Sequence, residues 1–217
     1  MLVIANALGQ AQGSSAFTEL ECEAIKAWVE HGGALLLIAD HRPFGAAAAT
    51  LAKRFGVAMS NSFTVDASNY DQKTGIPSFL LFNRQNQLLA NHPIIQGRNK
   101  SERINQVLTF TGQSLSIPPR SVAFLRLSDT AKDLNQRVAR VAEVSSASGA
   151  SAAHRAQGVA LSLGNGRVVI LGEAAMLSAQ LLKSPDQPDL PIGMNRSGFD
   201  NQQLALNIIH WLSRLLN

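Results

Sequence analysis

The chain of 217 residues is 46% hydrophobic and 16% charged, with a formal net charge of +4. This length and composition predict one folded domain over residues 1–217 and exclude a disordered chain. The longest apolar runs, such as residues 34–39, are too short to cross a membrane, and the densest basic segment, residues 98–103, carries an acid and no aromatic side chain. We therefore expect neither a membrane span nor a nucleic-acid partner.

The first half of the chain alternates strand and helix signals. Residues 2–6 and 34–39 are apolar and of strand length, and helix signals follow them over residues 18–31 and 45–55. Thr18 and Glu21 have the spacing of a capping box at the start of the first helix. Strands that alternate with helices predict parallel pairing with right-handed crossovers.

The apolar side chains of the first helix predict which face packs on the sheet. At 100° per residue this face contains Phe17, Leu20, Ala24, Ala27 and Trp28. Cys22, the single cysteine, lies away from that face and on no strand-to-helix turn, so we do not expect it to be a nucleophile.

The rest of the chain predicts short strands joined by irregular loops. Residues 157–163 and 168–171 flank Gly164-Asn165-Gly166, which is typical of a hairpin, residues 185–198 predict a long loop, and Asp200 is placed to cap the last helix. The β-prone pieces before the hairpin are residues 63–65, 79–82, 107–110, 122–125 and 138–144.

Polar side chains at the ends of predicted strands indicate a site. Asp40 and His41 follow one strand, Glu173 follows the second hairpin strand, and Asn195 lies in a later loop. Ligands of open α/β folds bind at the carboxyl edge of the sheet, so we expect these residues to line a crevice there. Asp40, His41 and Glu173 can act as acid and base or hold a divalent metal. The alternative for Asp40 and His41 is a capped strand end with a hydrogen-bonded turn. The alternative for Glu173 is a carboxylate that stabilises the start of a short helix.

Asp66 and His92 are weaker candidates for the same crevice. Each follows a strand-like piece, and each is also explained as a turn residue. The chain has no nucleotide or flavin motif and no serine-hydrolase elbow. A divalent metal is therefore the one cofactor class that these side chains suggest.

Residues 17–38, with a helix, Gly32-Gly33 and an apolar strand, resemble a segment of the class I glutamine amidotransferase-like superfamily. Within it the chain most resembles DUF4350-type domains and, more distantly, ThuA-like (trehalose utilisation) proteins. Further similarity lies in residues 91–94, 164–173 and 200–212. The resemblance implies an α/β fold, a flavodoxin-like three-layer sandwich with a mainly parallel sheet and a C-terminal β-hairpin.

The resemblance also implies what the site lacks and what it keeps. No cysteine and downstream histidine match the glutaminase site, whereas a histidine of ThuA-like proteins corresponds to His41. Domains of this type begin with an earlier strand and helix, so we expect this chain to lack the first strand and helix. We expect a cytoplasmic protein from the sequence as it stands, and an exported or periplasmic one if its start is truncated.

Three functions follow from these observations. The leading hypothesis is a non-glutaminase domain that binds a small polar ligand, such as a carbohydrate, at the carboxyl edge of the sheet. The second is a metal-assisted or acid/base hydrolase that uses Asp40, His41 and Glu173. The third is a non-catalytic interaction or scaffold module, and a homo-oligomer is compatible with all three.

Overall fold

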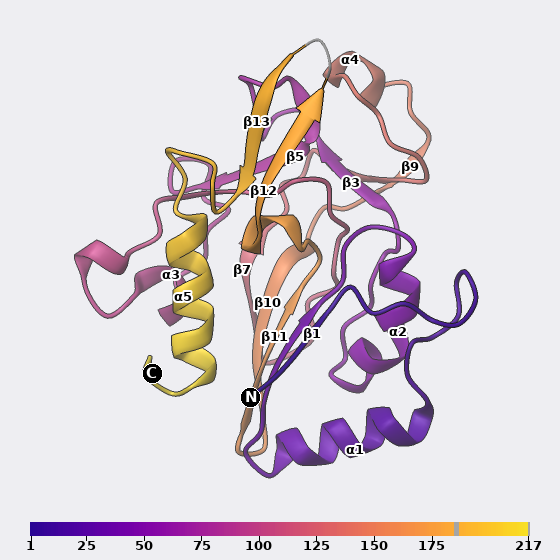
Figure 1. The fold of residues 1–217 in the computed structure, drawn as a ribbon, viewed down its shortest axis with the longest axis vertical. Helices are drawn as coiled ribbons and strands as arrows, with labels where there is room; N and C mark the ends of the chain where they lie inside the picture. The colour runs from indigo at the N-terminus through magenta and orange to yellow at the C-terminus, as the bar shows by residue number, and fades with distance from the viewer. Residues whose placement is uncertain (185–186, 217) are drawn as a thin grey trace.

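A five-stranded sheet forms the centre of the computed structural model, which describes residues 1–184 and 187–216 (Figure 1). The strand order is β1-β2-β11-β10-β7. β2 pairs in parallel with β1 and β11, whereas β10 pairs antiparallel with β11 and β7, so the sheet is mixed. The strands are β1 (Leu2–Ala5), β2 (Ala34–Ile38), β7 (Ser121–Arg126), β10 (Ala156–Leu163) and β11 (Gly166–Leu171).

Three smaller antiparallel sheets are added to this centre. Figure 1 shows β3, β5, β12 and β13 beyond the ends at which β1 and β11 finish. The first sheet contains β3 (Phe63–Asp66), β8 (Ala131–Leu134) and β9 (Gly149–Ser151). The second contains β4 (Tyr70–Asp71), β5 (Ile76–Asn83) and β6 (Gln106–Leu108). The third is the hairpin of β12 (Ala179–Ser184) and β13 (Gln187–Gly193).

The predicted flavodoxin-like sandwich with a mainly parallel sheet is therefore wrong. The hairpin at Gly164 and Gly166 turns β10 antiparallel to β11, and most of the remaining strands pair antiparallel in their own sheets. Short connections favour antiparallel pairing, because a parallel pair needs a crossover of a dozen or more residues. Among the strands that the structure describes, only the pairs β1–β2 and β2–β11 follow the expected parallel pattern.

Helices cover both faces of the central sheet (Figure 1). Leu35 and Leu37 of β2 pack with α1 and α2, and Leu36 and Ile38 pack with α3 and α5. Successive strand residues point to opposite faces, so β2 belongs to both cores. Among the described residues no helix is long and apolar enough to cross a membrane. The helices are α1 (Glu19–Glu30), α2 (Phe44–Arg54), α3 (Pro93–Gln96), α4 (Val141–Val144) and α5 (Asn201–Leu212), with 3₁₀ turns η1 (Lys100–Glu102) and η2 (Ala175–Leu177).

The face on which α1 packs differs from the predicted one. Cys22 and Val29 are fully buried, whereas Leu20 is 82% and Trp28 is 41% exposed. Contact with α2 as well as with the sheet sets the orientation of α1, so its most apolar stripe does not face the core. The predicted capping box is confirmed: the N–H of Glu21 donates to Thr18, and the Glu21 carboxylate accepts from the N–H of Thr18.

Three local predictions are also wrong. Residues 141–144 form α4 rather than a strand, and the predicted loop over residues 185–198 contains β13, although residues 185–186 lie outside the described residues. Asp200 precedes α5 but its side chain makes no cap hydrogen bond. Its Oδ2 instead accepts from the N–H groups of Asn105 and Gln106, at the start of β6.

Candidate functional site

Asp40 and Glu173 come together at the ends of two neighbouring strands. Ile38 of β2 and Leu171 of β11 are partners in the parallel register, and each acidic residue follows two positions later. The N–H of Ala174 donates to the Asp40 carboxylate, and the backbone N–H of Asp40 donates to Oδ1 of Asn6 at 2.9 Å. The ends of β1, β2 and β11 are thus joined through Asp40.

Glu173 is fully buried and stabilises the turn that follows β11. Its Oε1 accepts from the N–H of Ala175 at 2.6 Å and its Oε2 from the N–H of Met176 at 2.8 Å, at the start of η2. Burial, and next the negative charge of Asp40, raise the pKa of Glu173 to about 8. At neutral pH this carboxyl group is protonated in the folded protein.

Burial also raises the pKa of Asp40. The hydrogen bond from the N–H of His41, at 2.8 Å to Oδ1, opposes this rise because it favours the charged form. Two neighbouring carboxyl groups that are both shielded from water cannot both ionise easily, so the pair carries one negative charge over the neutral range.

The segment before β7 closes over this carboxyl pair. The side chain of Gln113 donates from Nε2 to the carbonyl oxygens of Ala39 at 2.9 Å and Asp40 at 2.8 Å. A Cβ atom on Gly112 would lie 2.6 Å from the Glu173 Cβ, so the backbone is packed directly on that side chain. The crevice predicted at this edge is therefore filled by protein at Glu173.

The side chain of His41 contacts Phe63 in the sheet of β3 and β8. Its Nδ1 is hydrogen-bonded with the carbonyl oxygen of Arg42 at 2.8 Å, and its ring lies 4.7 Å from the ring of Phe63. Arg42 donates to the carbonyl oxygens of Asn61 and Asn135. These contacts connect the turn after β2 to the segments that flank β3 and β8.

The other predicted site residues lie elsewhere. Asp66 is buried and accepts from the N–H groups of Ser68 and Asn69 and from the hydroxyl groups of Ser128 and Thr130, which is the role of a turn residue. Asn195 is exposed in the turn after β13.

His92 has a structural role as well. Its Nδ1 accepts from the N–H of Ile94 at the start of α3, and its ring packs against Phe124 and Trp211. Burial, and next the charge of Arg167, lower the pKa of His92 to about 4, so the ring is neutral at pH 7.

Within residues 1–184 and 187–216, no group of three or more His, Cys, Asp or Glu side chains is arranged to hold a metal ion. Asp40 and Glu173 supply only two carboxyl groups, and the His41 ring is held against Phe63. The geometry of this edge fits a structural joint better than a metal centre.

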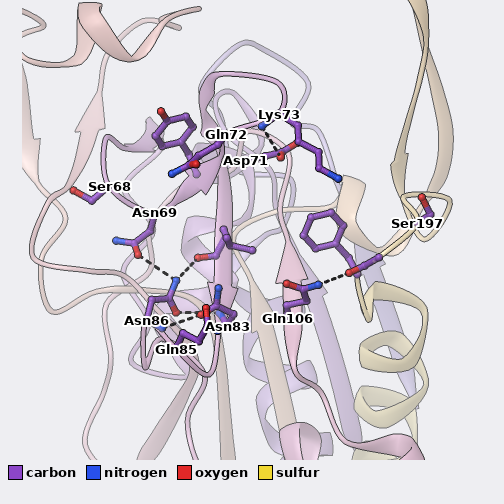
Figure 2. A pocket seen from close by; sticks show the side chains of 14 residues that line it. Ser68, Asn69, Asp71, Gln72, Lys73, Asn83, Gln85, Asn86, Gln106 and Ser197 are labelled. Carbon is purple, nitrogen blue, oxygen red and sulfur yellow. Dashed lines mark hydrogen bonds between the residues drawn. The ribbon is translucent and has the colours of Figure 1, made fainter.

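A cleft lies beside β4 and β5, away from the carboxyl pair (Figure 2). Its volume is about 660 Å³, and Asp40, His41 and Glu173 are not among the residues that line it. Asp71 at its edge pairs with Arg196 at 2.8 Å, and both side chains are largely buried. Its lining is rich in carboxamides, contributed by Asn69, Gln72, Asn83, Gln85, Asn86 and Gln106, with Tyr70 and Phe199 as the aromatic residues.

Some of these carboxamide side chains are held by hydrogen bonds within the protein, and others are free to bind a ligand. Asn86 donates to Oδ1 of Asn69 at 3.1 Å and to the carbonyl oxygen of Leu81 at 2.8 Å, so it fixes the loop (Figure 2). Gln72 and Gln85 are exposed, and no described residue accepts or donates a hydrogen bond at their side chains. The cleft therefore combines a fixed frame with adaptable donors and acceptors.

This cleft was not predicted from the sequence, because most of its residues lie in segments whose pattern indicates irregular loops between short strands. Residues 69–72 and 83–86 each contain several carboxamides, and antiparallel pairing of β4 with β5 brings the two segments together. The available signal was the repeated Asn and Gln in two loops that flank one predicted strand.

Comparison with known proteins bears on the fold. No protein-family model matches the chain, and no curated protein matches it. Among solved structures, the chain is similar to one titled "mmIFT52 N-terminal domain", with 18% sequence identity and a TM-score of 0.58. The match covers 91% of this chain and 72% of that chain.

This likeness corrects the resemblance inferred from the sequence. The structural neighbour is an IFT52 N-terminal domain, so the assignment to the amidotransferase-like superfamily, to DUF4350-type domains or to ThuA-like proteins is wrong. The Gly32-Gly33 turn followed by an apolar strand is common to many α/β segments, so it does not identify one family. At this level of identity the likeness concerns the fold.

Proposed function

We propose that this protein is a non-catalytic binding domain for a hydroxyl-rich ligand, such as a carbohydrate, and that the ligand binds in the carboxamide-lined cleft. The observation that supports this most is the gathering of Asn and Gln side chains from β5, from β6 and from the loops next to β4 and β5 around one hollow of about 660 Å³. The proposal keeps the ligand class expected from the sequence and moves its place from Asp40 to the cleft.

The chemistry of the cleft suits hydroxyl groups. Each carboxamide offers both donors and acceptors, as a sugar hydroxyl does, and aromatic rings pack on the apolar faces of sugar rings. Asp71 is neutralised by Arg196, so a neutral ligand meets no unpaired buried charge there. Tyr70 and Phe199 supply the aromatic surface.

A panel of neutral oligosaccharides tests the proposal. Tetramers derived from maltose, cellulose and chitin are added to the protein, and at least one is expected to raise its melting temperature, because binding to the folded state stabilises it. The double variant Gln72→Ala with Gln85→Ala should weaken that binding about fivefold for each hydrogen bond lost.

Gln202→Ala provides the matched control, because Gln202 is exposed on α5 and does not line the cleft. Its affinity should equal that of the wild type. The proposal fails if no oligosaccharide in the panel changes the melting temperature, or if the double variant binds as tightly as the control.

A second candidate function is self-association through α1. Leu20 and Trp28, which are 82% and 41% exposed, lie with the exposed Ala24 on one stripe of this helix. Two such stripes can bury each other in a symmetric pair. Sedimentation velocity should show a dimer that Leu20→Lys disrupts and that Leu206→Lys, on α5, leaves intact; a wild-type monomer at high concentration contradicts this candidate.

A further inference from the structure

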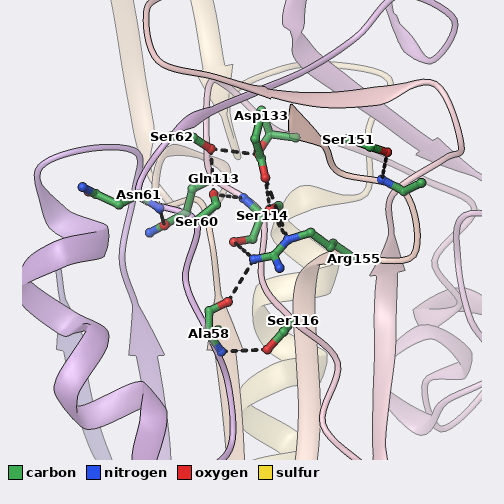
Figure 3. A network of polar contacts seen from close by, with 12 residues as sticks. Ala58, Ser60, Asn61, Ser62, Gln113, Ser114, Ser116, Asp133, Ser151 and Arg155 are labelled. Atoms are coloured by element: carbon green, nitrogen blue, oxygen red, sulfur yellow. Dashed lines mark hydrogen bonds and ion pairs between the residues drawn. The ribbon is translucent and has the colours of Figure 1, made fainter. Parts of the chain in front are cut away.

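A second cleft, of about 490 Å³, lies between the loop before β3 and the β8–β9 pair. Asp133 of β8 and Arg155, just before β10, line it together with several serines. Figure 3 shows these side chains in one polar network that reaches from Ala58 to Asp133. This cleft is separate from the carboxamide-lined one, with which it shares no lining residue.

Arg155 is held rigidly by one edge of its guanidinium group. Its Nε donates to Oγ of Ser114, and its Nη2 donates to the carbonyl oxygens of Ala58 at 3.0 Å and Ser114 at 3.2 Å. Among the described residues none accepts a hydrogen bond from Nη1. The guanidinium is therefore fixed in orientation, with two N–H donors left for a ligand.

Asp133 orients this arrangement and accepts hydrogen bonds at both of its carboxylate oxygens. Its Oδ1 accepts from the hydroxyl groups of Ser62 at 2.8 Å and Thr64 at 2.6 Å, and its Oδ2 accepts from Ser114. Because the Ser62 proton is directed to Asp133, the hydroxyl of Ser60 donates to Ser62 at 2.7 Å. The hydroxyl groups deep in the network thus have fixed directions.

The charges around the cleft favour a singly charged anion. Asp133 lies 3.8 Å from Arg155 and offsets part of its charge. The charged residues that line the cleft are Arg155 and Asp133, so the positive charge that a ligand meets there is small. The exposed hydroxyl groups of Ser148 and Ser151 line the outer part of the cleft.

We propose that this cleft binds a carboxylate group, which accepts hydrogen bonds from Nη1 of Arg155 and from the serine hydroxyls of the outer cleft. Hydrogen bonds from a guanidinium to a carboxylate are charge-assisted, and a guanidinium whose charge is partly offset by Asp133 suits a monoanion better than a doubly charged phosphate. The carboxylate comes either from the end of a peptide chain or from a small organic acid.

Nuclear magnetic resonance of the intact chain tests this proposal at the Nε–H signal of Arg155. The probes are acetate, an N-acetylated alanine tetrapeptide with a free carboxylate, the same tetrapeptide as its carboxamide, and inorganic phosphate. The signal should shift saturably with the free tetrapeptide or with acetate and remain unchanged with the carboxamide. Tighter binding of the tetrapeptide identifies a peptide end, and equal binding identifies a small acid.

Arg155→Lys keeps the charge but removes both the fixed Nη1 donors and the Nε–H signal, so its affinity for the carboxylate is measured by isothermal titration calorimetry and should fall at least tenfold. Arg126→Lys, at an exposed position of β7, is the matched control and should bind as the wild type does. Ser151→Ala lies outside the Asp133 network, and it should weaken binding even if Arg155→Lys fails to fold. A linear, non-saturating response, an equal response to the carboxamide, or tighter binding of phosphate overturns the proposal.

Discussion

Glu173 makes the stability of this protein depend on pH. Its pKa rises from an ordinary 4.5 to about 8, first through burial and then through the charge of Asp40. Below pH 4.5 the carboxyl is protonated in both states and its contribution is complete. Between 4.5 and about 8 the unfolded chain loses a proton that the folded protein keeps, so stability falls as pH rises, by up to about 1.4 kcal/mol per pH unit.

Asp40→Asn is expected to reduce this dependence between pH 7 and 8. The substitution removes the nearby charge, so the pKa of Glu173 falls and less of the proton difference remains in that range. The free energy of unfolding, measured in urea at several pH values, gives the slope. His92 does not interfere, because its pKa is lowered from 6.5 to about 4 and its effect on stability lies below pH 6.5.

Asp129→Asn is the control for this measurement, since Asp129 is exposed. Its slope should match that of the wild type. A wild-type stability that stays constant or rises between pH 7 and 8 contradicts the assignment of a raised pKa to Glu173.

At the residue scale, strand ends could be predicted and side-chain directions could not. The pattern of residues 34–39 and 168–171 indicated that Asp40 and Glu173 follow strands, and the parallel register of β2 with β11 brings them together. The direction of His41 depends on its contact with Phe63, which lies on a separate sheet. Local patterns carry no information about such a distant contact.

Asn201 fastens α5 to the rest of the molecule. It is fully buried, its Oδ1 accepts from the N–H of Leu108 at 3.1 Å, and its Nδ2 donates to the carbonyl oxygens of Leu108 at 2.7 Å and Met176 at 3.2 Å. Asn201→Ala leaves these buried backbone groups without partners, so the free energy of unfolding should fall by about 3 kcal/mol.

Urea denaturation measures this change, and the neighbouring Gln202→Ala gives the comparison. Gln202 is exposed, so its substitution should alter the free energy of unfolding by less than about 0.5 kcal/mol. Equal effects of the two substitutions would show that the hydrogen bonds of Asn201 do not stabilise the helix.

At the element scale, signals within one segment were reliable. The capping box at Thr18 and the hairpin at Gly164 formed as predicted, because both depend on residues a few positions apart. The burial of α1 and the conformation of residues 138–144 and 187–193 depend on packing between distant segments. Hydrophobic periodicity alone could not choose between the two apolar stripes of α1.

At the scale of the whole molecule, antiparallel additions changed the fold class. The sequence indicated the parallel strands β1 and β2 and the hairpin of β10 and β11, but the pairing partners of the short strands between residues 57 and 156 are set by contacts far along the chain. The segment at Gly112 occupies the expected crevice at Glu173, and segments of the added antiparallel sheets line the two clefts elsewhere. The place of the candidate site therefore followed from topology rather than from motifs.

The way β2 is shared between two cores predicts that the molecule unfolds in one step. Leu36 contributes to the core that contains Trp211, and Leu37 contributes to the core beneath α1, which carries Trp28. Trp28→Phe and Trp211→Phe leave one tryptophan each, and their fluorescence should report the same urea midpoint.

Leu36→Ala should then lower the free energy of unfolding by about 2–5 kcal/mol in both single-tryptophan backgrounds, because Leu36 is only 3% exposed and its loss leaves a cavity. The single strand β2 transmits this loss to the opposite face, since its backbone cannot unfold on one side alone. If Leu36→Ala shifts the midpoint reported by Trp211 and leaves that reported by Trp28 unchanged, the two faces unfold independently and residues 1–217 do not form one cooperative domain.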